Sequence, residues 1–284
     1  MMELEPRIAR MTRMQGNAFI LQKQRERVSA FTFAKQRERA SAFTLIELLI
    51  VMGIIGVLLV LIAPAFTSMK GGTDVTSAAY TIEGVLDTAR TYAKANNTYT
   101  WVGFYEEDVS QPSISHGSDP CIGCVGRLVM STVASNDGTM IYTGNLSSPV
   151  TLDSTKLTQV GKLAKIENLH LTTFGAPPGT PPTSPFATRP EVATASKIGD
   201  GITAPPNPYL TFYYPADGSQ YQFKKVVQFT PRGEAVITNR NYTMAPVSEV
   251  GVEPTHGTTL DTNSTNPVAI QFTGFGGSVK IYRK

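Results

Sequence analysis

The sequence has few of the residues on which metal sites depend. Its 284 residues include two cysteines and three histidines. Cys121 and Cys124 form a CxxC pair, but no second pair supplies the remaining ligands of a zinc site. His116 is close to this pair, whereas His170 and His256 are isolated. We therefore expect no metal site, and the CxxC pair is either a local disulfide or two free thiols.

The sequence also lacks the local signatures of common enzymes. It contains no HExxH zinc helix, no phosphate-binding P-loop, no GxSxG nucleophile elbow and no dinucleotide-binding glycine fingerprint. The densest acidic cluster is Glu106-Glu107-Asp108, and a run of three acids at the end of a strand is typical of a solvated turn. The sequence therefore predicts that the protein is not an enzyme and needs no cofactor.

Positive charge is scarce outside the N-terminal segment. Residues 1–42 hold nine of the 25 basic and four of the 22 acidic residues, which leaves 16 basic and 18 acidic residues beyond them. The net charge is thus +5 before residue 43 and −2 after it. A body that is near neutral argues against a nucleic-acid-binding module.

Only one long apolar run is present. From Leu48 to Met69, 22 residues carry no formal charge, and as a helix they would cross a hydrocarbon core of about 30 Å. The basic segment before the run predicts a cytoplasmic N-terminus and a C-terminal body on the other side of the membrane. The run is also longer than the roughly 7–15 apolar residues of a cleaved secretory signal.

The residues at the start of this run form an ordered motif. Residues 42–51, AFTLIELLIV, resemble the processing site of type IV prepilins and type II secretion pseudopilins. The resemblance implies that prepilin peptidase cuts between Ala42 and Phe43 and that the amine of Phe43 is then methylated. Most family members have glycine before the cut, so Ala42 implies less efficient processing. The resemblance also implies that Thr44, Leu45, Ile46 and Glu47 belong to the segment that assembles with other subunits.

Glu47 interrupts an otherwise apolar stretch. A carboxylate inside a membrane helix costs a few kcal/mol unless it is neutralised or paired. In the mature chain that the resemblance implies, Glu47 is the fifth residue. It could then pair with the Phe43 amine of a neighbouring subunit, which would offset the desolvation of both charges. We therefore expect Glu47 to set the stagger between subunits.

The segment before the motif is written twice, as KQRERVSAFT at 23–32 and KQRERASAFT at 35–44. The first copy is followed by charged residues that would not insert into a membrane. Ala30–Phe31 is therefore predicted to be a silent copy of the cleavage site.

These features predict an α+β, pilin-like fold in four parts. They are a leader peptide at 1–42, a membrane-spanning assembly helix at 43–69, an amphipathic helix at 70–97 and a β-rich head at 98–284. Pro64 predicts a kink in the first helix, and Gly71-Gly72 predicts a loosening after it. Residues 175–208 contain nine of the 19 prolines, which predicts a long surface loop, either an unstructured insertion or an interaction loop.

Periodicity places the elements of the head. Apolar residues at three- and four-residue steps predict the buried face of the helix, which should end at Asn96-Asn97: Val75, Ala78, Ala79, Ile82, Leu86, Ala89 and Ala93. Pro231-Gly233 should be a turn, and residues 268–282 a closing hairpin. Strands are predicted at 99–105, 125–132, 139–143, 166–174, 209–214, 219–230, 234–238, 247–252, 267–273 and 278–282.

Two looser resemblances refine the function. The order of residues from Leu86 to Phe104 resembles the H-type minor pseudopilins, and the C-terminal end resembles the Verru_Chthon cassette protein D family. The H-type resemblance implies a minor subunit of a type II secretion pseudopilus or a related type IV filament, whereas the Verru_Chthon group is pilin-like and of undefined role. Such a subunit would lie in the inner membrane, with its N-terminus in the cytoplasm and its head in the periplasm, and its partners would be prepilin peptidase and other pilin subunits.

Two other functions compete with this interpretation. A minor pilin that captures DNA would need a basic head surface, for which these residues are available: Lys224, Lys225, Arg232, Arg240, Lys280, Arg283 and Lys284. A secreted protein could be released after Ala63-Pro64-Ala65, which resembles an ordinary signal-peptidase site. Glu47 within the apolar run counts against this second alternative.

Overall fold

The structure is a computed structural model of the chain. It describes residues 44–112, 124–142, 148–176, 186–200, 210–215, 220–237, 244–260 and 266–284, with the backbone alone at 61–74. The chain divides into two compact units, Met1–Leu58 and Leu59–Lys284, which are described separately.

Helix α2 runs from Leu45 to Ala95. Its backbone stays helical through Pro64 and through Gly71-Gly72, where the sequence predicted a loosening of the chain. A glycine costs a helix only about 1 kcal/mol relative to alanine, so two glycines do not end a helix of this length. The predicted kink at Pro64 stays a prediction.

Among the residues described, no helix combines the length and apolar character that crossing a membrane requires. The span predicted over 43–69 therefore also stays a prediction.

Within the second unit, α2 carries the amphipathic pattern that the sequence predicted. All seven residues of the predicted stripe are buried, at 0–1% exposure. The helix also ends where expected, because Asn97 adopts a left-handed conformation with φ of 49°. The Thr98 N–H then donates to the Ala93 carbonyl at 3.0 Å, which is the long bond of a Schellman C-cap.

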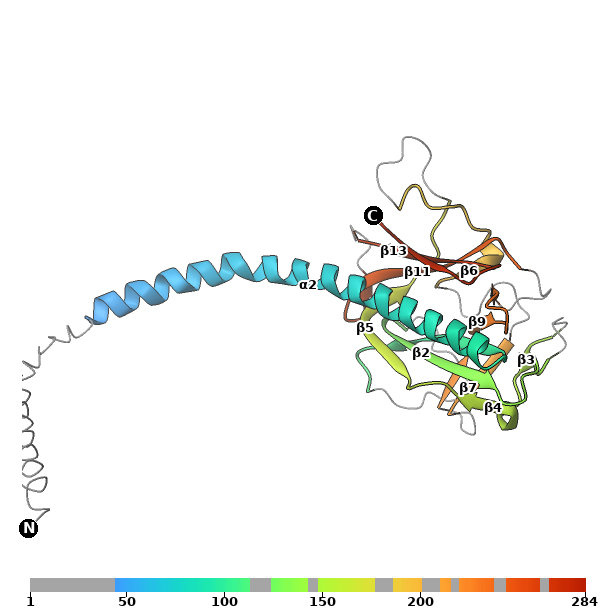
Figure 1. The fold of residues 1–284 in the computed structure, drawn as a ribbon. Helices are drawn as coiled ribbons and strands as arrows, with labels where there is room; N and C mark the ends of the chain where they lie inside the picture. The colour runs from blue at the N-terminus through green and yellow to red at the C-terminus, as the bar shows by residue number, and fades with distance from the viewer. Residues whose placement is uncertain are drawn as a thin grey trace, which may run out of the picture. The chain divides into compact units, whose positions relative to one another are not determined.

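The β-rich part of the head is built from two sheets (Figure 1). Within the described residues, eleven strands form the large sheet, whose main path runs β10-β9-β1-β2-β5-β11-β13-β14. In chain order these strands are β1 (Thr100–Asp108), β2 (Gly126–Ser135), β5 (Ala164–Leu171), β9 (Lys225–Phe229), β10 (Ala235–Ile237), β11 (Val247–His256), β13 (Val268–Thr273) and β14 (Val279–Arg283). Three short strands lie off this path: β4 (Leu157–Gln159) pairs with β2, and β6 (Lys197–Ile198) and β12 (Thr259–Leu260) pair with β11. The small sheet has the order β3-β7-β8, with bounds Val150–Thr151, Leu210–Tyr214 and Tyr221–Phe223.

Three strands of the large sheet, β1, β2 and β9, are buried on both faces along nearly all of their length, whereas β5 and β14 have exposed positions. On β1, Val102 and Phe104 join the core beneath α2, whereas Trp101 and Tyr105 join a second core with residues of the small sheet. This alternation follows the two-residue period of a strand. The head is therefore a three-layer α+β arrangement, and the predicted α+β class is confirmed for it.

Most predicted strands and both predicted turns are confirmed. The turn at Pro231-Gly233 joins β9 to β10, with Phe229 opposite Ala235, and the closing hairpin is β13 paired with β14. The strand predicted at 139–143 is wrong for residues 139–142, where Ile141 is left-handed with φ of 66° and interrupts the extended backbone. The segment predicted as one strand at 219–230 instead supplies β8 to the small sheet and β9 to the large one.

The Pro-rich segment was predicted to be a surface loop, and this is wrong for Lys197–Ile198, which form β6; residues 186–193 are irregular and several of them are exposed. Arg189, Val192 and Ile198 are buried there, and β6 pairs in parallel with β11. The cause is a charge pair that sequence spacing does not reveal, since the Arg189 guanidinium meets Glu249 of β11 at 3.1 Å. The rest of the predicted loop lies largely outside the described residues.

Candidate functional site

The sequence motif coincides with the start of α2. Thr44 stands just before the helix and accepts two bonds, one at its carbonyl from the Leu48 N–H at 3.2 Å and one at its Oγ1 from the Glu47 N–H at 3.3 Å. Thr44 is thus the N-cap of the helix. The Thr-x-x-Glu spacing is that of a capping box, and the negative charge of Glu47 lies in the first turn, where the helix dipole favours it.

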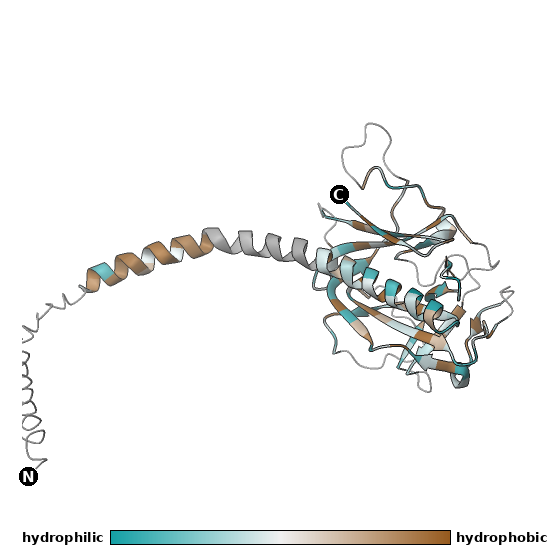
Figure 2. Ribbon diagram, viewed as in Figure 1, coloured by the Kyte–Doolittle hydropathy of each residue, from teal (hydrophilic) through white to brown (hydrophobic). Residues whose placement is uncertain are grey.

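The side chains that follow leave a large apolar surface uncovered. Thirteen large apolar side chains between Leu45 and Val60 are exposed, from 44% at Val51 to 81% at Leu45. Figure 2 shows this segment as almost uniformly hydrophobic, with one hydrophilic turn near its start. Glu47 is the only charged residue in the segment. A helix surface that is apolar on every side favours burial against other apolar groups.

The predicted processing and assembly residues are placed in part. Thr44, Leu45, Ile46 and Glu47 follow one another in the cap and first turn of α2, and all four are exposed. Ala42 and Phe43 lie outside the described residues. The pairing of Glu47 with the Phe43 amine therefore stays a prediction.

The two cysteines are also placed in part. Cys124, which lies two residues before β2, is disulfide-bonded. Cys121 lies outside the described residues, so the pairing of the two stays a prediction. In the described part of the chain, no group of three or more histidine, cysteine and acidic side chains is placed to hold a metal ion.

The acidic cluster Glu106-Glu107-Asp108 was predicted to be a solvated turn, and this is wrong, because all three residues belong to β1 and Glu107 is buried. Glu107 is fully buried and receives the Tyr221 hydroxyl at 2.5 Å and an Arg127 guanidinium nitrogen at 3.2 Å. Sequence spacing could not reveal these partners, which are 114 and 20 residues away. The two acids Glu106 and Glu107 follow each other along a strand, so they point to opposite faces of the sheet and bind different partners.

Glu106 binds its partners on the other face. Its Oε1 lies 2.7 Å from His170 Nδ1 and accepts the Leu171 N–H at 2.9 Å, while its Oε2 lies 3.6 Å from Lys225 Nζ. Burial lowers the pKa of Lys225, and the charge of Glu106 opposes that shift. Lys225 also donates to the Gly199 carbonyl at 2.5 Å. This buried lysine cannot contribute to the basic surface that DNA capture would need.

Comparison with known proteins identifies the N-terminal segment. Residues 37–63 match the family profile described as the prokaryotic N-terminal methylation motif. The match contains the predicted cleavage site, the capping Thr44 and Glu47. No curated protein and no solved structure matches the chain. The chain thus carries the N-terminal signature of type IV pilin-like proteins, which supports pilin-type cleavage and methylation.

Proposed function

We propose that this protein is a minor pseudopilin, a pilin-like subunit that is cleaved and methylated at Phe43 and then assembled into a filament. The observation that carries the proposal is the coincidence of the methylation motif at 37–63 with a capped helix whose apolar side chains are exposed around one acid. The motif alone supports processing, whereas the exposed surface supports assembly.

The uncovered helix supplies a driving force for assembly. Full burial of one large apolar side chain is worth about 1.5–3 kcal/mol. The thirteen exposed side chains between Leu45 and Val60 are already partly covered by the helix itself. Burying the surface that remains exposed would contribute on the order of 10 kcal/mol to the free energy of assembly, before the entropy of association is subtracted. In the precursor we assign that cover to the inner membrane, and in the filament to the helices of other subunits.

Glu47 supplies the specificity that apolar packing lacks. Apolar helices slide past one another with little change in energy, whereas a buried carboxylate without a partner is costly. Pairing with the new Phe43 amine of a neighbour would fix one register. Prepilin peptidase and other pilin subunits are the partners in this proposal. The head would lie in the periplasm, in a type II secretion pseudopilus or a related filament.

The experiment is the Glu47→Gln variant, expressed with its leader beside prepilin peptidase and partner pilins. Removing one partner of a buried pair typically costs about 3–5 kcal/mol. We therefore expect the processed variant to fall at least about tenfold in the sheared filament fraction. Glu83→Gln is the matched control, because it makes the same change on the same helix outside the motif. Normal assembly of the Glu47 variant would contradict the proposed role.

A further inference from the structure

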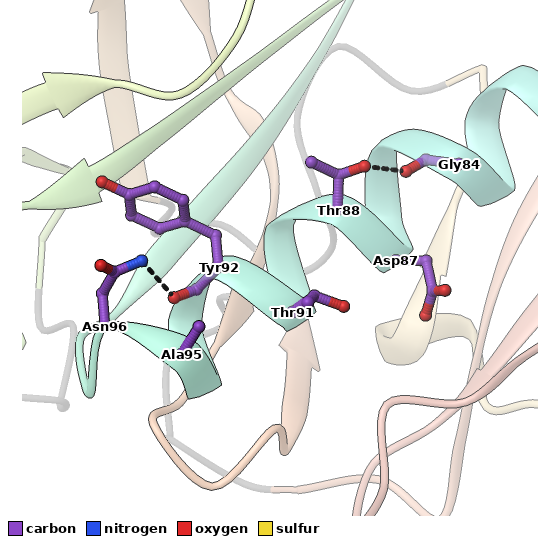
Figure 3. Close-up of a pocket in the computed structure, with 7 residues that line it drawn as sticks. All are labelled: Gly84, Asp87, Thr88, Thr91, Tyr92, Ala95 and Asn96. Carbon is purple, nitrogen blue, oxygen red and sulfur yellow. Dashed lines mark hydrogen bonds between the residues drawn. The ribbon is translucent and has the colours of Figure 1, made fainter.

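Two hollows adjoin at the C-terminal end of α2. One is a groove of about 550 Å³ along the outer side of the last turns of the helix. The other is a pocket of about 440 Å³ between the helix end, the turn after β2, and β4. Both are lined by Tyr92 and Asn96. Figure 3 shows these two side chains at the last turn, with the Asn96 amide donating to the Tyr92 carbonyl at 3.0 Å.

The pocket has a polar lining. It is made of amides, hydroxyls, one carboxylate and one phenol, with no lysine, arginine or aliphatic side chain: Tyr92, Asn96, Asn97, Thr98, Ser135, Asn136, Asp137, Gly138 and Thr158. The adjoining groove is less polar, and it runs past Gly84, Thr88 and Ala95. A ligand that filled both would need a hydroxyl-rich part and a less polar part.

Hydrogen bonds fix the walls of the pocket. The Thr98 hydroxyl donates to the Ser135 carbonyl at 2.8 Å, which joins the helix end to β2. The Asn136 N–H donates to the Lys156 carbonyl at 2.9 Å, and the Thr158 hydroxyl donates to the Asn136 side chain. The pocket is therefore largely formed before any ligand arrives, which lowers the cost of binding.

The two carboxylate oxygens of Asp137 differ in their hydrogen bonding. Its Oδ1 accepts three bonds, from the Ser135 hydroxyl at 2.8 Å and from the N–H and hydroxyl of Thr139 at 2.9 and 2.7 Å. Bonds from Thr139, and then from Ser135, lower the pKa of this carboxyl to about 2, so it is ionised at neutral pH. Within the described residues Oδ2 accepts no hydrogen bond, which leaves it available to a ligand hydroxyl, and the charge of Lys156 acts weakly on the same carboxylate.

The side-chain amides of two asparagines are also available to hydrogen-bond a ligand. The left-handed backbone of Asn97, with φ of 49°, is fixed by its place in the helix cap, and its exposed amide has no partner within the described residues. Asn96 uses its amide N–H₂ toward Tyr92, so its Oδ1 remains an acceptor. The pocket thus offers acceptors from three side chains and a donor from Asn97.

The chemistry of the lining selects among ligand classes. A carboxylate beside the negative end of a helix repels anions. A calcium site usually takes several carboxylates among its six to eight oxygen ligands, and this pocket has one. A neutral ligand with many hydroxyl groups suits the lining best, because each hydroxyl both donates and accepts. A half-buried tyrosine at the rim adds an apolar face.

We propose that this pocket binds a saccharide, with hydroxyl groups on Asp137 and Asn97 and a sugar ring against Tyr92. The adjoining groove takes the next ring or an attached apolar group. The volume lies within the range of about 300–1,000 Å³ that small-molecule sites occupy.

The test is saturation-transfer NMR on the full chain in a detergent without a sugar headgroup. The sugar probes are D-glucose, D-galactose, N-acetyl-D-glucosamine and cellobiose. Calcium chloride is titrated in a separate arm by calorimetry, because Ca²⁺ has no proton signal. The variants are Asp137→Asn, which removes the charge, and Asn97→Gly, which removes the amide and tolerates the left-handed backbone. Asp153→Asn is the matched control, since Asp153 makes the same Asp-x-Thr turn with Thr155 outside the pocket.

We expect millimolar binding of at least one probe, weakened about tenfold or more by each pocket variant and unchanged by Asp153→Asn. Three results would overturn the proposal. They are the absence of transfer from all four sugars, binding that both pocket variants leave intact, and binding of calcium alone that Asp137→Asn abolishes. Circular dichroism of each variant separates a lost site from a lost fold.

Discussion

The buried pair of Arg189 and Glu249 gives the sharpest test of the head. Each side chain is 2% exposed, and Nε lies 3.1 Å from Oε2. The other guanidinium nitrogens donate to the carbonyls of Phe186 at 3.0 Å and Gly175 at 2.8 Å. The guanidinium also lies over the Phe186 ring, 4.1 Å from its centroid. One side chain therefore holds the Pro-rich segment against β11.

The structure sets the size of the effect expected for Arg189→Ala. Removing one partner of a buried ion pair typically costs about 3–5 kcal/mol, because the other charge is left buried and unpaired. Glu249 would keep one donor, the Gln271 amide at 2.8 Å, so we expect a loss near 3 kcal/mol in the free energy of unfolding. Arg189→Lys should lose less, because it keeps the charge but cannot reproduce the planar fork of donors.

The assay is urea unfolding of the full chain, followed by tryptophan fluorescence. Trp101 is the single tryptophan and is fully buried in the second core of the head. A double-mutant cycle with Glu249→Gln should show coupling of at least about 1 kcal/mol. Backbone amides in 186–200 should also exchange faster in Arg189→Ala. A loss below about 1 kcal/mol, or additive single effects, would refute the reasoning.

Three further predictions concern the core and one turn. Leu86→Ala should destabilise the head by about 2–5 kcal/mol, and Leu86→Met by less than about 1.5 kcal/mol, as measured by the same unfolding assay. Gly103→Ala should cost about 1–3 kcal/mol, because its new Cβ would lie 2.5 Å from the Phe223 side chain; Gly84→Ala, with nothing within 4 Å, should be neutral or stabilising. The pKa of Asp137 is lowered from 3.8 to about 2. Its ionised form therefore stabilises the folded head fully above pH 3.8, and this stabilisation is lost as the pH falls through about 2. The stability of Asp137→Asn should therefore converge on that of the wild type in this window, and a constant difference would contradict the assignment.

Local patterns made part of the fold predictable. The stripe from Val75 to Ala93 repeats at helical spacing, and the cap at Asn96-Asn97 needs only neighbouring residues. The processing motif is also contiguous in sequence, so Thr44 and Glu47 could be singled out without a structure.

The interior charges were not predictable for the opposite reason. Glu107 meets Tyr221, and Arg189 meets Glu249, across 114 and 60 residues. The sequence next to Glu107 or Arg189 contains no signal that identifies the partner. The pocket also combines segments that are distant in sequence, namely the end of α2, the turn after β2, and β4. Of its lining, the sequence singled out only Asn96-Asn97, as the end of a helix.

The most direct test of the proposed function is mass spectrometry of the N-terminal peptide from the membrane-extracted protein. The account predicts a chain that begins at Phe43 with a methylated amine. A chain that begins at Phe66 would mean ordinary secretion, and a chain that keeps residues 1–42 would mean that Ala42 prevents processing. Either result would contradict the assignment of this protein as a processed filament subunit.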